Sequence, residues 1–437
     1  MGTVGPPHGG TPVSGTTAAA PPPRTGPWRF VLAFGTVSLL ADFVYEGARS
    51  VTGPLLARLG ASAAVVGAVT GAGEAAALVL RLASGPLADR TRRFWAWTVA
   101  GYALSVLTVP FLGLVSTLWA AGALVLAERV GKAVRSPAKD TLLSHATAAT
   151  GRGRGFGVHE AMDQIGALIG PLVVAAVLAA GGGDYGPALG VLAAPGVLVL
   201  GLLAWLRWRV PDPASYETAP APAPAGARAG ASGAEAAEAP AGGAPDATAA
   251  RTGTLPRAFW VFAAFTAMTT AGFATFGVLS FHLVERDLLS PAAVPVVYAA
   301  AMGVDALAAL AVGWAYDRLG PRVLVVLPLL SAAVPALAFS DALVPAVLGS
   351  LAWGAATGVQ ESTLRATVAD LVPSGRRATA YGLFAAVMGA AAAVGGTLAG
   401  VLYERSVPAL VTVTASVQAA ALLLLAVLLP RRRTGRR

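Results

Sequence analysis

Long apolar runs, separated by short polar stretches, make up most of the chain from residue 28 onward. Twelve runs reach about 20 residues, the length that an α-helix needs to cross the hydrocarbon core of a bilayer. We predict spans at residues 28–50, 63–86, 95–115, 118–137, 156–181, 187–208, 257–283, 292–314, 321–339, 343–369, 377–402 and 408–430. The chain is therefore predicted to be an all-α membrane protein.

Two stretches without bulky apolar residues divide this pattern. Residues 1–27 are rich in Pro, Gly, Thr and Ala and are predicted to form a disordered tail. Residues 211–256 are rich in Ala, Pro and Gly and are predicted to form a flexible linker. These stretches leave two six-helix halves, residues 28–210 and 257–430, and a basic tail at residues 431–437. The predicted fold is twelve transmembrane helices in two pseudo-symmetric six-helix bundles.

Composition supports a membrane location. Hydrophobic residues make up 56% of the chain and charged residues 12%, whereas soluble domains carry about 25% charged residues. The net charge of +9 comes from Arg residues in short loops, which argues against a nucleic-acid-binding surface. Lys and Arg gather in loops on one side, so both termini and the linker are predicted to be cytoplasmic. We expect a multi-pass protein of a bacterial inner membrane whose first span is not cleaved.

Several kinds of chemistry are excluded by the residues present. The chain has no Cys, and its four His residues lack ligand spacing, so we expect no disulfide and no metal site. It contains no phosphate-binding Gly-x4-Gly-Lys-Ser/Thr loop, which argues against direct use of ATP. We find no nucleophile–base pair at a credible membrane depth, and we expect neither an enzyme nor a cofactor.

The two halves repeat a loop pattern. GPLADRTRR follows the second span and GWAYDRLGPR follows the eighth, so Gly-x-x-x-Asp-Arg recurs at equivalent places. A weaker repeat aligns Arg135-x4-Asp140 with Arg365-x4-Asp370. Internal repeats of this kind are typical of transporters that hold a small solute between two helix bundles.

The first of these loops resembles the loop 2–3 signature of the major facilitator superfamily, Gly-x-Leu-Ala-Asp-Arg-x-Gly-Arg. The matching residues are Gly85, Leu87, Ala88, Asp89, Arg90 and Arg93, while Arg92 replaces the second Gly. The resemblance implies that Asp89 helps to lock the cytoplasmic side by engaging the other bundle. Arg90 and Arg93, with Asp317 and Arg318 in the second copy, are predicted to share this conformational role.

The fifth predicted span is similar to a motif of proton-coupled antiporters in the same superfamily. Gly157, Gly166, Gly170 and Pro171 match it, and the final Gly-Gly of the motif is Val174–Ala175 here. The resemblance implies a bend in this helix and export of a solute in exchange for protons.

Five carboxylates at membrane depth are our candidates for proton coupling, because a desolvated carboxylate in an apolar bundle takes up a proton readily. They are Asp42, Glu46, Glu74, Glu128 and Asp163. Two interpretations stay open for the first span: Glu46 carries a proton, or it pairs with Arg49 and closes the outer side. Glu74 has no evident partner in its own span.

The fourth span carries Glu128, Lys132 and Arg135 at i, i+4 and i+7, on one helical face. We predict that Lys132 and Arg135 form an ion-pair network or a cytoplasmic gate with Glu160 of the fifth span. His159 is either a satisfied interior residue or a proton shuttle. In the second half, Glu361 and Arg365 are predicted to form a local salt bridge, with Arg365 part of the gate.

The predicted function is secondary active transport of a small organic solute by alternating access, with proton-coupled efflux favoured. Proton-coupled uptake by symport is the alternative, and a membrane sensor that transports nothing is a further one. We expect a monomer whose partners are the solute, protons and the lipid bilayer. Four aromatic residues of the second half could line the solute cavity, or could instead serve in packing or as membrane-interface anchors: Phe276, Tyr298, Trp314 and Trp353.

Overall fold

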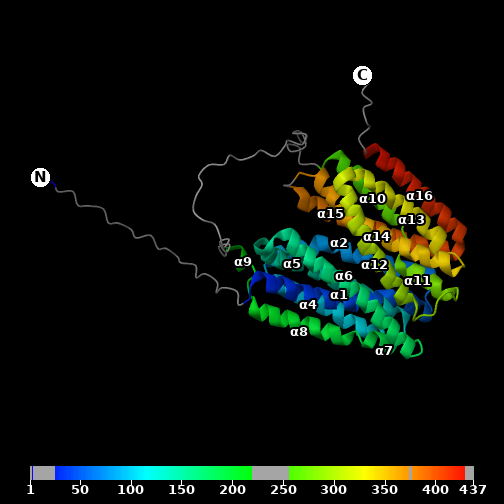
Figure 1. Cartoon of the computed structure of the whole chain (residues 1–437), viewed down its shortest axis with the longest axis horizontal. Coiled ribbons are helices and arrows are strands. Elements are labelled where there is room, and N and C mark those ends of the chain that lie inside the picture. Colours follow the sequence, from blue (N-terminus) through cyan, green and yellow to red (C-terminus); the bar gives the residue numbers. More distant parts are fainter. Residues whose placement is uncertain (1, 3–24, 219–254, 374–375, 429–437) are drawn as a thin grey trace, which may run out of the picture.

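A computed structural model describes residues 2, 25–218, 255–373 and 376–428. Most of the predicted tails and linker, and the side chain of Arg365, lie outside the described residues. The described part of the chain is helical and contains no strand. The two halves lie side by side, with the blue-to-green helices below the yellow-to-red helices in Figure 1.

The N-terminal bundle follows the predicted spans closely, but two spans are broken. Its helices are α1 (Pro27–Arg58), α2 (Ala63–Val79), α3 (Arg81–Thr91), α4 (Phe94–Leu112), α5 (Leu118–Thr150), α6 (Arg152–Ala180), α7 (Tyr185–Gly190) and α8 (Ala193–Arg209). The second predicted span is divided into α2 and α3, and the sixth into α7 and α8. The short helix α9 (Ser215–Thr218) follows this bundle.

The C-terminal bundle has the same order of long helices. It consists of α10 (Arg257–Ala271), α11 (Phe276–Glu285), α12 (Val294–Leu319), the 3-10 helix η1 (Gly320–Val325), α13 (Val326–Ala338), α14 (Leu343–Leu371), α15 (Arg377–Arg405) and α16 (Val407–Leu428). The seventh predicted span is divided into α10 and α11 by residues 272–275.

Ten segments of the described chain are long and apolar enough to cross a bilayer. One of them, Val294–Ala338, has 45 residues and contains both α12 and α13. The helix α5 is not among the ten, because its central part carries Glu128, Arg129, Lys132 and Arg135. Apolar length alone therefore gives a multi-pass membrane protein, and it gives a lower count than the twelve predicted spans.

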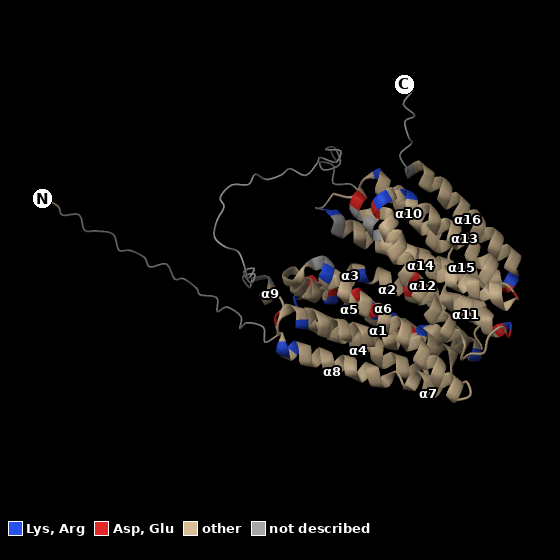
Figure 2. Ribbon diagram, in the orientation of Figure 1, with Lys and Arg blue, Asp and Glu red and all other residues tan. Residues whose placement is uncertain are grey.

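The helices run between two ends of the molecule. We define the termini end as the end where α1 begins and α8 ends, and the far end as the end that holds the α1–α2 and α11–α12 connections. Figure 2 shows Lys and Arg gathered at the termini end, from which the N-terminal tail and the linker leave. This distribution is the one that underlies the predicted orientation, and the cytoplasmic location of this end stays a prediction.

The two bundles touch through a limited set of helices. Across the seam, α2 packs along α15, α6 against α12, and α1 against α11. Near the far end the backbones come very close. A Cβ added at Gly53 would lie 2.2 Å from the carbonyl oxygen of Gly277, and one at Gly67 would lie 2.1 Å from that of Gly396. Small residues of this kind permit tight helix packing in membranes, so the far end is closed.

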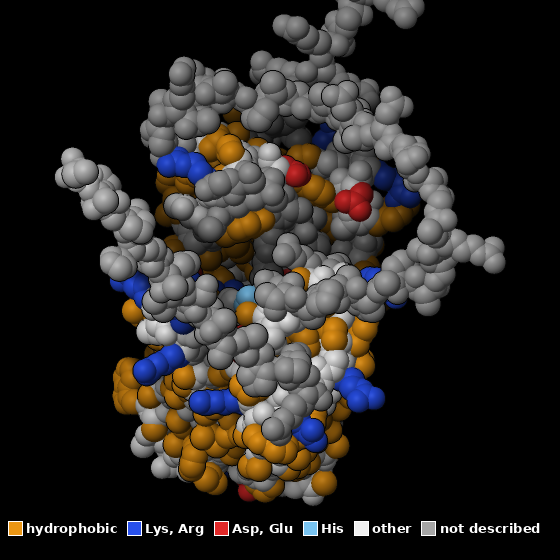
Figure 3. All heavy atoms as spheres, turned by 90° about the vertical axis from the view of Figure 1, so that its left-hand side faces the viewer, with side chains coloured by type: hydrophobic (Ala, Val, Ile, Leu, Met, Phe, Trp, Pro, Cys, Tyr) orange, Lys and Arg blue, Asp and Glu red, His pale blue; other side chains and the backbone are white. Residues whose placement is uncertain are grey.

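The termini end differs from the far end. Within the described residues, α5 packs mainly on helices of its own half, and the same holds for α14. Figure 3 shows this end of the molecule, hollowed between the two halves. The structure is thus closed at the far end and open at the termini end.

Part of the predicted linker packs onto the N-terminal bundle. Tyr216 in α9 is buried, and its hydroxyl donates a hydrogen bond to the carbonyl oxygen of Thr25 at 2.8 Å. Its ring lies 5.8 Å from that of Phe30 in α1, measured between centroids. Residues 25–27 and 211–218 are therefore held together at the termini end, and residues 219–254 lie outside the described part.

The motif glycines of α6 bring this helix close to α1. A Cβ at Gly166 would lie 2.1 Å from the carbonyl oxygen of Leu39, and one at Gly170 would lie 2.2 Å from that of Phe43. Pro171 lies inside α6, which continues on both sides of it. At Gly157, by contrast, an added Cβ would meet nothing within 4 Å.

We therefore expect Gly170→Ala to separate α1 from α6 and to lower the free energy of unfolding by about 1–3 kcal/mol, the usual range for overpacking. Thermal unfolding of the purified protein measures this change. The control is Gly157→Ala, for which we expect no loss of stability. Equal melting temperatures for the two variants would contradict the packing role of Gly170.

Candidate functional site

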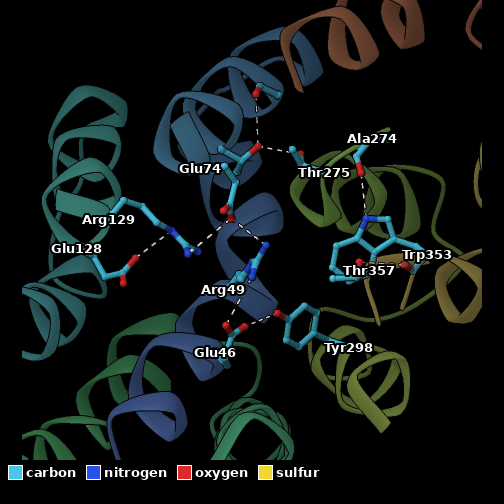
Figure 4. Close-up of polar contacts among 12 residues, drawn as sticks. Glu46, Arg49, Glu74, Glu128, Arg129, Ala274, Thr275, Tyr298, Trp353 and Thr357 are labelled. Carbon is cyan, nitrogen blue, oxygen red and sulfur yellow. Dashed lines mark hydrogen bonds and ion pairs between the residues drawn. The ribbon is translucent and has the colours of Figure 1, made fainter. Parts of the chain in front are cut away.

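Five charged side chains from three helices form the central cluster: Glu46 and Arg49 of α1, Glu74 of α2, and Glu128 and Arg129 of α5 (Figure 4). Arg49 lies 2.8 Å from Glu74 and 3.5 Å from Glu46. Arg129 lies 3.1 Å from Glu128 and 3.6 Å from Glu74. Charges at membrane depth are costly unless they are paired, and ion pairs connect all five side chains of this cluster.

The central cluster borders a cavity. The side chains of Glu128 and Arg129 are 9% and 7% exposed, whereas those of Arg49 and Glu74 are 26% and 28% exposed. The cavity has an empty volume of about 580 Å³ up to and including its open mouth. Its lining includes Tyr45, Arg49, Glu74, Glu128, Arg129, Thr275 and Phe276, so both bundles contribute. The charged groups are therefore placed where a solute in this cavity meets them.

A tyrosine of the C-terminal bundle contacts the central cluster. The hydroxyl of Tyr298 in α12 donates a hydrogen bond to Glu46 across the seam. A second polar contact joins the hydroxyls of Thr70 and Thr275 at 2.8 Å. Sequence reasoning could not find the first contact, because it joins residues 252 positions apart.

Of the four aromatic residues considered for the cavity lining, Phe276 borders the cavity and Tyr298 contacts Glu46 across the seam. The rings of Phe276 and Tyr298 meet edge to face at 4.6 Å, and the indole of Trp353 packs beside them. Trp314 does not line the cavity, since this side chain is 62% exposed on the outside of the bundle. The guanidinium of Arg318 lies 3.4 Å above its ring.

A second group, the tyrosine–cation cluster, lies beside the central cluster. It comprises Asp42 and Tyr45 of α1, Tyr102 of α4, and Lys132 and Arg135 of α5. The hydroxyl of Tyr45 donates a hydrogen bond to Asp42. Lys132 lies 4.7 Å above the ring of Tyr45, and Arg135 lies 5.1 Å from that ring and 4.4 Å from the ring of Tyr102.

A third set of contacts joins α5 to α6. Lys139 lies 3.9 Å from Asp163, and Nδ1 of His159 lies 3.5 Å from the same carboxylate. The other ring nitrogen of His159 is 2.8 Å from the hydroxyl of Ser38. Both ring nitrogens of this buried histidine thus have a polar neighbour, as expected for an interior residue that is satisfied by its surroundings.

The predicted ion pairs are only partly those found. Arg49 does pair with Glu46, but Glu74 is not isolated, since Arg49 and Arg129 both neutralise it. Glu160 is exposed, and the link between α5 and α6 is Lys139–Asp163 instead. The i, i+4, i+7 rule selected one face of α5 and so missed Arg129. The high density of charged residues in this span is the sequence signal that could have found Arg129.

The loop residues predicted to gate the cytoplasmic side lie at the open termini end. Asp89, Arg90 and Arg93 are exposed near the end of α3, and Asp317 and Arg318 are exposed at the end of α12. Within the described residues, no hydrogen bond or ion pair joins Asp89 to the C-terminal bundle. Because the structure is hollowed between the bundles at this end, a locking contact of Asp89 is expected in the opposite conformation and stays a prediction.

Comparison with known sequences gives two informative relatives. A protein of Mycobacterium tuberculosis described as uncharacterized is 59% identical over 410 residues, which cover 94% of this chain and 95% of that protein. An uncharacterized MFS-type transporter of Methanocaldococcus jannaschii is 31% identical over 142 residues, 32% of this chain and 35% of that protein.

Solved structures share the fold at low sequence identity. The nucleoside transporter NupG matches with a TM-score of 0.66 and 15% identity over 91% of this chain and 98% of that chain. The peptide transporter POT in complex with sulfate matches with a TM-score of 0.69 and 15% identity over 93% of this chain and 95% of that chain.

The family comparison agrees with the two-bundle architecture and with the loop resemblance. The sequence model of the Major Facilitator Superfamily matches residues 35–339 and 261–437, which together include both helix bundles. The chain therefore belongs to the Major Facilitator Superfamily, and it is a membrane transporter by family.

Proposed function

We propose that this transporter moves a small organic solute across the bacterial inner membrane by alternating access, and that proton movement drives export. The observation that carries this proposal is the hydrogen bond from Tyr298 to Glu46 across the seam. It joins a buried carboxylate, which can bind a proton, to the bundle that must move.

The geometry supplies a route from proton binding to motion. Glu46 as a carboxylate attracts Arg49 and accepts the hydrogen bond from Tyr298. A proton on Glu46 removes its charge and weakens both contacts, since hydrogen bonds and ion pairs to a charged acceptor are the stronger ones. The α1–α12 contact then loosens, and the far end of the seam is freer to open.

Glu74 is the second carboxylate that fits this role. It is the most exposed acid of the central cluster, so the cavity gives it access to water and protons. When Glu74 is protonated, Arg49 would keep its ion pair with Glu46 and Arg129 its ion pair with Glu128. Asp42, Glu128 and Asp163 remain proposed carriers, because each is a carboxylate within the same bundle interior.

The direct test is flux in proteoliposomes made with a solute selected by a thermal-shift screen of metabolites and drugs. Exchange of solute against protons is the expected result. Movement of solute and protons in the same direction would establish uptake by symport instead. A solute that binds but does not move would contradict transport and favour a sensor.

A separate prediction concerns Asp89. We expect Asp89→Asn to reduce flux by about tenfold or more while solute binding is kept, because the residue acts on a conformation and does not border the cavity. Flux and equilibrium binding are measured on the same preparation. Asp341→Asn, at an exposed far-end carboxylate, is the control. Loss of binding in the Asp89 variant would refute this assignment.

A further inference from the structure

We infer that Lys132 and Arg135, with the rings of Tyr45 and Tyr102, bind an anionic group of the transported solute, a carboxylate or a phosphate. This inference rests on the proposed transport function and adds the class of solute. The contacts of these two cations distinguish them from the other cations of the bundle interior.

Arg135 is a buried cation without an ion pair. Arg135 as a whole is 3% exposed, and its Nε and Nη2 atoms are enclosed without a hydrogen-bond partner. In the described structure, no carboxylate lies within 4.0 Å of its guanidinium. Enclosing N–H groups of a charged side chain without partners is costly, so a ligand that accepts hydrogen bonds from them would be bound favourably.

The two tyrosine rings stabilise the guanidinium without using its hydrogen bonds. A cation above an aromatic face is attracted by about 1–2 kcal/mol, and Arg135 lies over two such faces. The N–H groups of a guanidinium point outward in its own plane, so stacking leaves the hydrogen bonds of its edge unused. That edge matches two oxygens of a carboxylate or phosphate, which makes Arg the preferred side chain for these groups.

Lys132 adds a second cation on the same helical face, three residues before Arg135. It is half-buried, and its amine has no hydrogen bond or ion pair to the described residues. Three other interior cations, Arg49, Arg129 and Lys139, each lie within 4.0 Å of a carboxylate. Of these five interior cations of the described residues, Lys132 and Arg135 lack such a partner, and they are neighbours, as in a site for one anionic group.

Asp42 is not the anionic partner of Lys132 and Arg135. Its carboxylate accepts the hydrogen bond of Tyr45, and neither Lys132 nor Arg135 lies within ion-pair distance of it. Tyr45 takes part in both the site and the cavity, because its ring faces the two cations and the residue also lines the cavity. A solute whose anionic group lies on the two cations would extend its remaining part along Ala48, Val109 and Leu112 in the cavity wall.

The test uses the full chain in lipid nanodiscs with two probes, inorganic phosphate and succinate. Binding is measured by calorimetry and by the shift in melting temperature, against potassium chloride at the same ionic strength. We expect at least one probe to bind the wild type, and Arg135→Gln to weaken that binding by about 10–100-fold, as loss of a charge-assisted hydrogen bond implies. The two probes distinguish a carboxylate site from a phosphate site.

Two further variants keep the result interpretable. Arg135→Lys retains the charge and loses the planar fork, so it should fold and bind more weakly than wild type. Lys139→Gln removes a cation that has its own carboxylate and should keep binding. Failure of both probes to bind wild type above the chloride control, or binding by Arg135→Gln as tight as that of wild type, would overturn the inference. Transport of a neutral or cationic solute would do so while leaving the proposed function intact.

Discussion

Replacing Arg129 by Gln is expected to lower the free energy of unfolding by about 3–5 kcal/mol, the usual effect of removing one member of a buried ion pair. The guanidinium is 7% exposed and touches Glu128 and Glu74. Without it, Glu128 remains as a buried carboxylate, 9% exposed, that has lost its ion-pair partner. Detergent-induced unfolding, followed by tryptophan fluorescence, measures the loss.

A double variant separates burial of charge from loss of packing. Glu128→Gln together with Arg129→Gln removes both charges, so it should be more stable than Arg129→Gln alone. Arg286→Gln is the matched control at an exposed pair, since Arg286 and Asp341 are 50% and 76% exposed. We expect a change of about 0–1 kcal/mol there. If Arg129→Gln proves as stable as this control, the central cluster does not hold α5 in place.

Replacing Tyr298 by Phe is expected to shift the protein toward the conformation that is open at the far end. The change removes one hydroxyl and keeps the ring that packs on Phe276. A hydrogen bond to a charged acceptor contributes about 1.5–3 kcal/mol, which corresponds to a shift of about 10–100-fold between conformations. The bond is present in the closed far end described here, so its loss disfavours that state.

The natural chain has no Cys, so spin labels can be placed at two engineered positions. Ser62→Cys at the start of α2 and Glu285→Cys at the end of α11 lie on exposed residues of opposite halves at the far end. Distances between the labels should lengthen in Tyr298→Phe. Tyr316→Phe is the control, because that hydroxyl bonds to Asp370 within the C-terminal bundle. The same distance distribution in both variants would show that Tyr298 does not hold the seam.

The fold was largely predictable because bilayer length and apolar runs leave few alternatives. The breaks were not predictable from hydropathy, since Leu80 and Leu192, where two spans are interrupted, are as apolar as their neighbours. The fourth span was found by sequence although its charges keep α5 out of the set of apolar segments.

The site was less predictable, because spacing along one helix shows which of its residues share a face but not which residues of other helices they contact. Glu74 has no cation in its own span, yet Arg49 of α1 lies 2.8 Å away. The predicted partner Glu160 is one helical turn from Asp163, the acid that in fact pairs with α5. The packing of α6 on α1 sets which side of α6 faces α5, and it places Asp163 rather than Glu160 on that side.

The most direct measurement is proton movement linked to the selected solute, in proteoliposomes that contain a pH-sensitive dye. Wild type and Glu46→Gln are compared at equal protein content, with solute binding measured on both. We predict that solute addition moves protons through the wild type and that Glu46→Gln binds the solute without this proton signal. Proton movement of the same size in the variant would contradict coupling through Glu46 and the central cluster.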